Sequence, residues 1–200
     1  TAYFLRHEAQ EIAWHTRHLC RHVNSEIPVV KARLSPVGEG LQVMVYVADQ
    51  KELFSRICSL FEGISFDIFE AKIHTTRHGY ALDTFQVIST RIEPGDPAAY
   101  RDLISLVETQ AVMALSSSGP LPEPGRGRVS RRVRSFPVTP RVTLNPDERM
   151  QRWLLRVSAS DRSGLLYAIA RVLARRVSRR KCCVRAAYTA ARDYPVETFS

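Results

Sequence analysis

Residues 42–57 read QVMVYVADQKELFSRI, and residues 154–169 read LLRVSASDRSGLLYAI, so one pattern occurs twice in the chain. Each copy opens with a strand-like apolar run and then places apolar residues at helical spacing. Three residue types recur in register: Asp49, Leu53 and Ile57 in the first copy, and Asp161, Leu165 and Ile169 in the second. This internal repeat indicates two copies of one small module.

The rest of the first copy supplies the other elements of that module. Residues 66–73 alternate in polarity as a strand does, and residues 80–88 return as its hairpin partner. A helix is predicted over 97–115, and an edge strand over 136–144. The resulting order, β-α-β-β-α-β, is the ferredoxin-like arrangement.

We therefore predict an α+β protein with two ferredoxin-like modules, of which the second is truncated. Pro28 and Pro36 are expected to keep residues 24–36 irregular. Because the second copy lacks its last strand, we expect residues 153–159 to keep an open apolar edge. The predicted bounds are a helical connector at 1–37, a first module at 38–146 with a long basic loop at about 116–135, and an incomplete second module at 151–200.

The formal net charge of +9 is concentrated in two stretches, residues 126–141 and residues 171–185. Such clusters suit nucleic acid or an acidic partner, or they are simply a solvated linker and a solvated helix face. Aromatic residues that could stack on bases are scarce inside both stretches. A basic interaction module is therefore the alternative function, and nucleic acid is not the favoured partner.

Several classes of protein are excluded by the residue pattern. The four cysteines include an adjacent pair and no C-x-x-C, so neither a disulfide framework nor a zinc ribbon is indicated. No apolar run reaches the roughly 20 residues of a membrane span, and no signal peptide is recognised. We expect a cytoplasmic protein. Because the chain begins with Thr1, we also expect it to be a piece of a longer one.

Catalytic motifs are also missing from the sequence. Nucleotidyl transfer needs closely spaced carboxylates that hold Mg²⁺, but no Asp-x-Asp or Asp-x-Glu occurs. An adjacent His-Asp pair, as a phosphohydrolase of the HD type requires, does not occur either, nor does a phosphate-binding P-loop. We expect the chain to have no catalytic residues and no cofactor of its own.

Four stretches carry a family resemblance: residues 11–17 (EIAWHTR), 32–36 (ARLSP), 70–80 (EAKIHTTRHGY) and 161–170 (DRSGLLYAIA). The paired modules, each with an Asp after its first strand, look like tandem ACT domains. From Tyr3 to about Ala174 the chain resembles the bacterial bifunctional PII uridylyltransferase/uridylyl-removing enzymes. In that family, a nucleotidyltransferase domain and an HD phosphohydrolase domain precede two C-terminal ACT domains.

The resemblance implies that this chain is the connector after the HD domain plus a glutamine-sensing regulatory tail. The parent would then be a uridylyltransferase and uridylyl-removing phosphodiesterase acting in nitrogen regulation. It also implies L-glutamine as effector, and the PII protein and the upstream catalytic domains as partners. Any Mg²⁺ would belong to the catalytic domains of the parent.

In ACT domains an amino acid typically binds near the loop between the first strand and the first helix. A helix N-terminus offers free N–H groups to an α-carboxylate, and a glycine lets the backbone approach it. The second copy fits this chemistry, and its predicted effector residues are Asp161, Arg162, Ser163, Gly164 and Leu165. The first copy is a weaker candidate, because Glu52 replaces the glycine there. Asp49 of the first copy is predicted to be the N-cap of the helix that follows.

His15, His18 and His22 follow one another at helical spacing near the start of the chain. We find no carboxylate or thiol that would complete a metal site with them, so no metal site is predicted. Residues 175–185 depart from the first copy, with charges on both faces of the expected strand. A pair of reading-frame errors or a degenerate copy would each explain this departure, and both explanations stay open.

Overall fold

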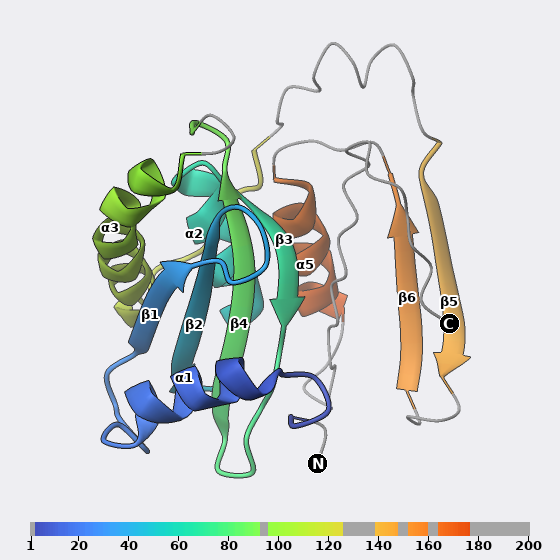
Figure 1. Cartoon of the computed structure of the whole chain (residues 1–200). Coiled ribbons are helices and arrows are strands. Elements are labelled where there is room, and N and C mark those ends of the chain that lie inside the picture. The colour runs from blue at the N-terminus through green and yellow to red at the C-terminus, as the bar shows by residue number, and fades with distance from the viewer. Residues whose placement is uncertain (1–2, 93–95, 126–138, 148–151, 160–163, 177–200) are drawn as a thin grey trace.

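A computed structural model of the 200-residue chain describes residues 3–92, 96–125, 139–147, 152–159 and 164–176 (Figure 1). The fold is α+β, as predicted. Its elements in chain order are α1 (Ala9–Leu19), β1 (Val29–Leu34), β2 (Leu41–Ala48), α2 (Leu53–Gly63), β3 (Phe66–Lys72), β4 (Tyr80–Ser89), α3 (Pro97–Ser116), β5 (Arg141–Asp147), β6 (Arg152–Ser158) and α5 (Leu165–Arg176).

The first unit is built on a four-stranded antiparallel sheet in the order β1-β2-β4-β3. β2 lies in the middle, and all its residues except Ala48 are buried, which explains its nearly continuous apolar sequence. On one face, α2 and α3 cover the main hydrophobic core, whereas α1 crosses the other face (Figure 1). Phe85 and Leu82 of β4 point to these two faces, following the alternation of the strand.

Two strand predictions are wrong. Residues 29–34, predicted to be irregular, form the edge strand β1, which pairs with β2 from Val29–Tyr46 to Leu34–Leu41. Pro28 directly precedes this strand, where its missing N–H costs no ladder hydrogen bond. The carboxylate of Glu108 in α3 accepts a hydrogen bond from the Ala32 N–H at 2.9 Å, so the outer edge of β1 is partly capped.

The second wrong prediction is the last edge strand over 136–144. The strand found there, β5, does not join the first sheet, and it pairs with β6 in a separate two-stranded sheet (Figure 1). One edge of β6 is therefore covered by β5, which corrects the expectation of an open edge on that side. Val142 and Leu144 of β5 remain 66% and 56% exposed.

The structure extends the repeat backwards to include these strands. β1 pairs Val29 with Tyr46, and β5 pairs Arg141 with Ser158; both members of the second pair lie 112 positions after those of the first. The helices α2 and α5 begin at residues 53 and 165, with the same separation. Each copy therefore begins with two antiparallel strands and a helix, and the two strands pair in the same register in both copies. This arrangement is compatible with a ferredoxin-like module. The predicted domain bounds stay a prediction.

The helix of the second copy packs on the first unit. Tyr167 and Ala170 of α5 are 2% and 3% exposed and belong to the same core cluster as Phe61 of α2. Helices α2 and α5, which are equivalent in the repeat, are thus in direct contact. None of the helices in the part of the chain that the structure describes is long and apolar enough to cross a membrane.

Candidate functional site

The predicted effector loop lies at the start of α5. Asp161, Arg162 and Ser163 fall outside the described residues, whereas Gly164 and Leu165 are placed at the first turn of the helix. Gly164 has φ +75°, and a Cβ atom at this position would overlap the carboxylate of Glu62 in α2. The left-handed backbone favours glycine, whereas the overlap involves only the end of the flexible Glu62 side chain, which can move aside. The described end of the loop predicted to bind the effector therefore lies next to the carboxylate of Glu62 in the first unit.

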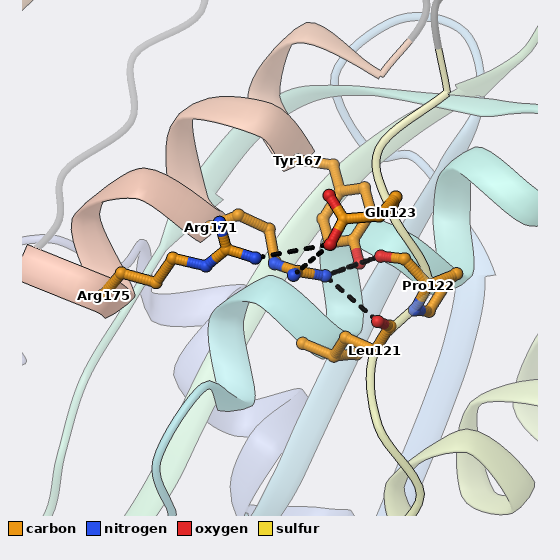
Figure 2. A network of polar contacts seen from close by, with 6 residues as sticks. All are labelled: Leu121, Pro122, Glu123, Tyr167, Arg171 and Arg175. Carbon is orange, nitrogen blue, oxygen red and sulfur yellow. Dashed lines mark hydrogen bonds and ion pairs between the residues drawn. The ribbon is translucent and has the colours of Figure 1, made fainter.

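A buried arginine fixes α5 to the chain that follows α3 (Figure 2). Arg171 is 8% exposed, and its guanidinium donates to the carbonyl oxygens of Leu121 at 3.1 Å and Pro122 at 2.6 Å. The hydroxyl of Tyr167 donates to the same Pro122 oxygen at 2.5 Å. The side chain of Glu123 accepts from Arg171 at 3.0 Å. Arg171 is therefore engaged inside the protein and is not part of an exposed basic surface.

The weaker candidates of the first copy lie in a different local structure from the one predicted. Asp49 is not an N-cap: α2 begins at Leu53, and Asp49 instead accepts a hydrogen bond from the Thr75 hydroxyl at 3.4 Å. Glu52 takes a left-handed backbone with φ 64°. Its equivalent 112 positions later is Gly164, at φ +75°. Both copies thus use a left-handed residue before the helix, and only the second uses the residue type that adopts it without strain.

Asp83 lies in β4, on the face of the sheet that α2 covers. Its side chain is nearly inaccessible, and burial raises the pKa of this carboxyl to about 7. The backbone N–H of His74 donates to Asp83 Oδ1 at 3.2 Å, which opposes the shift only in part, and the charge of Asp49 adds to it. Sequence reasoning assigned no role to this residue.

A cluster of buried polar side chains lies between α1 and the other face of the sheet. Its centre is Glu11, which is 4% exposed. Lys72 Nζ and His7 Nδ1 each lie 2.9 Å from Glu11 Oε2, and the Gln42 amide donates to Oε1 at 3.1 Å. Although burial opposes ionisation, these contacts with His7 and Lys72 lower the pKa of Glu11 to about 2. Glu11 is therefore a buried, ionised carboxylate that forms an ion pair with the ammonium of Lys72 in β3.

His15 occupies the same cluster and is 1% exposed. The Tyr3 hydroxyl lies 2.6 Å from its Nδ1, and the Thr84 hydroxyl lies 3.1 Å from its Nε2. Burial, with a smaller contribution from nearby His7, lowers the pKa of His15 to about 4, so the imidazole is neutral at physiological pH. In the same way, burial raises the pKa of Tyr3 to about 12.

The structure corrects the expectation for the histidines. His15 does not group with His18, which is half-buried in α1, or with His22, which follows the end of α1 and is exposed. It groups with Glu11 and His7, and among the described residues these three form a group whose ligand atoms all lie within 4.8 Å of one another. The expectation that no carboxylate completes a site with these histidines is therefore wrong: Glu11 lies four residues before His15 and His7 lies eight residues before it, both at helical spacing.

Comparisons with known proteins agree with the resemblance noted in the sequence. A bifunctional uridylyltransferase/uridylyl-removing enzyme of Cupriavidus pinatubonensis is 60% identical over 177 residues, which are 87% of this chain and 20% of that protein. Relatives of the same name in Ralstonia nicotianae and Burkholderia mallei are 58% and 54% identical, each over 86% of this chain and 20% of their own length. No solved structure matches the chain.

A family model described as the uridylyltransferase GlnD fifth domain matches residues 1–18, a range that includes most of α1. The match ends before the first strand of the sheet, at Val29. The chain spans about a fifth of the length of the curated relatives it matches. The resemblance predicted from the sequence is therefore confirmed: over 87% of its length, this chain is similar to the bifunctional uridylyltransferase/uridylyl-removing enzymes.

Proposed function

We propose that this chain is the glutamine-sensing regulatory region of an enzyme that uridylylates and deuridylylates PII signal proteins. The observation that carries the proposal is its similarity, at 54–60% identity, to a fifth of the length of bifunctional uridylyltransferase/uridylyl-removing enzymes. The sequence has no Asp-x-Asp and no His-Asp pair, which the two reactions of the parent would require. The region therefore regulates catalytic domains that lie elsewhere in the parent. Any Mg²⁺ is held by those groups, and the whole enzyme acts in the cytoplasm.

The repeat supports a sensing role. Small paired modules that present an equivalent loop twice are suited to bind an effector at one copy and to report it through the other. Here α2 and α5 occupy equivalent places in the repeat and pack on each other. A ligand at the loop before α5 therefore acts directly on the helix pair, and through α2 on the sheet.

The second copy is the proposed glutamine site, with Asp161, Arg162, Ser163, Gly164 and Leu165 as its residues. Gly164 opens the backbone at the N-terminus of α5, where N–H groups suit a carboxylate; the Glu62 carboxylate lies against this position, so the α-carboxylate of a bound glutamine displaces it. In the first copy the equivalent residue is Glu52, whose side chain adds a negative charge at that position. Asp49 and Glu52 are accordingly expected to bind glutamine weakly or not at all.

Isothermal titration calorimetry of the purified chain with L-glutamine tests the proposal. Glutamate and alanine are the control ligands, because they change the side-chain amide and keep the α-amino and α-carboxyl groups. Saturable, glutamine-selective binding that is lost in Asp161→Ala and kept in the matched variant Asp49→Ala is the expected result. Absence of binding in a sample whose circular dichroism shows a folded protein contradicts the proposal.

A further inference from the structure

We propose that the cluster beneath α1, formed by His7, Glu11 and His15, binds a divalent transition-metal ion such as Zn²⁺ in exchange for the ammonium of Lys72. This proposal does not depend on the glutamine-sensing function, because the cluster lies on the opposite face of the sheet from α2 and α5.

The donor set suits such an ion. Two imidazole nitrogens and a carboxylate oxygen lie within 4.8 Å of one another, and all three residues are buried. Zn²⁺, Co²⁺ and Ni²⁺ prefer imidazole and carboxylate donors, and sites with three protein ligands are common among them. Both ring nitrogens of His15 are hydrogen-bonded, Nδ1 to the Tyr3 hydroxyl at 2.6 Å and Nε2 to the Thr84 hydroxyl at 3.1 Å, so a metal ion bound at His15 takes the place of one of these hydrogen bonds. The chain therefore supplies three ligands without a change of fold.

His7 gives the second, independent observation. Its side chain is 1% exposed, and its Nε2 has no hydrogen-bond partner among the described residues. Its Nδ1 approaches Glu11 at 2.9 Å but does not make a hydrogen bond of good geometry. A buried imidazole with unsatisfied nitrogens costs free energy, and coordination of a metal ion removes that cost.

Lys72 is the resident cation that a metal ion must displace. Its Nζ lies 2.9 Å from Glu11 Oε2 and balances the buried carboxylate charge. The Lys72 side chain is 22% exposed, so its long apolar stem allows the ammonium to move to solvent. Competition between the ammonium and the metal ion for Glu11 gives the proposal its most specific consequence: removal of the ammonium must strengthen metal binding.

The test is a titration of the metal-free chain with Co²⁺ and Zn²⁺ near neutral pH, in which the Co²⁺ absorption bands report coordination and calorimetry gives the Zn²⁺ stoichiometry. Four variants are compared. Glu11→Gln and His7→Ala remove a ligand, and Lys72→Met removes the competing cation. The double variant His18→Gln/His22→Gln is the matched control, because it removes one imidazole in α1 and one just after α1, both outside the cluster. Circular dichroism establishes that each variant is folded.

One metal ion per chain is expected, with affinity reduced by at least about 100-fold in Glu11→Gln and His7→Ala, since even outer-shell changes cost 10–100-fold. Affinity is expected to rise in Lys72→Met and to stay unchanged in the double control. The proposal is overturned if the folded chain binds no metal ion. It is also overturned if binding survives Glu11→Gln and disappears in the double control, which would mean a surface histidine pair only.

Discussion

Asp83 offers a quantitative test of how the sheet is stabilised. Its carboxyl is buried, its pKa is raised to about 7 by burial, and the His74 N–H donates to its Oδ1. In Asp83→Asn the amide oxygen can accept the same hydrogen bond, so the substitution removes the ionisable group and keeps the local geometry. We therefore expect this variant to be more stable than the parent protein at every pH at which the carboxyl is ionised in the unfolded chain.

The sign follows from proton linkage. In the unfolded chain the carboxyl ionises near the ordinary aspartate pKa of 3.8, whereas in the folded protein it holds its proton up to about pH 7. Between these values the folded state binds more protons, so this group makes stability fall as pH rises. A difference of about three pKa units, at 1.36 kcal/mol each, corresponds to a free energy on the order of 3–4 kcal/mol.

Urea unfolding followed by circular dichroism measures this effect in the parent protein and in Asp83→Asn at several pH values. At about pH 4 the parent protein and Asp83→Asn should have similar free energies of unfolding. At about pH 8 the variant should be more stable by about 3 kcal/mol. His15, whose lowered pKa makes stability rise between about pH 4 and 6.5, affects both proteins equally and cancels in the difference. A difference that does not change with pH, or a variant that is less stable near about pH 8, would refute the reasoning.

Three substitutions test the helix starts and the contact between the units. Gly164→Ala should destabilise the protein by about 1–2 kcal/mol in urea unfolding, because alanine is strained in the left-handed backbone at φ +75°. Gly63→Ala, at a position with open space and no positive φ, should not. Glu52→Gly should raise the melting temperature, by relief of about 1 kcal/mol of left-handed strain at φ 64°, and a lower melting temperature would contradict this. Arg171→Met removes the hydrogen bonds to the carbonyl oxygens of Leu121 and Pro122, which water can partly replace. The free energy of unfolding should fall by about 1–2 kcal/mol, and amide exchange in α5 should become faster. Unchanged exchange would contradict the role of Arg171 in holding α5 to the segment after α3.

Much of the fold follows from local sequence patterns. The apolar run of β2, the alternation along β4, and Asp96, which caps α3 by accepting from the N–H groups of Ala98 and Ala99, all predict the observed elements. The two prolines that flank β1 indicate an irregular segment, but proline is tolerated directly before an edge strand, which is why β1 does not follow from the local pattern. Extending the repeat backwards by the same separation would have shown that Pro28 and Pro140 precede equivalent strands.

The sites were less predictable, for a physical reason. Glu11 and Lys72 are far apart in the chain, and only the crossing of α1 over the sheet brings their charges to 2.9 Å. The burial of Asp83 also depends on tertiary packing, because an acidic residue within a strand is ordinarily expected at the surface. By contrast, the alignment of Gly164 with Glu52 follows from the repeat alone, and both residues directly precede their helices, while the effector role of Gly164 stays a prediction. Its left-handed backbone explains why the two copies differ in residue type there.

The most direct test of the account is hydrogen–deuterium exchange of the whole chain with and without L-glutamine. If the second copy is the sensor, glutamine should slow exchange in the first turn of α5, at residues 164–168, and at the end of α2 that Gly164 contacts. Residues 49–53 of the first copy should not change. Protection confined to residues 49–53, or no change anywhere in a folded sample at saturating glutamine, would contradict the account.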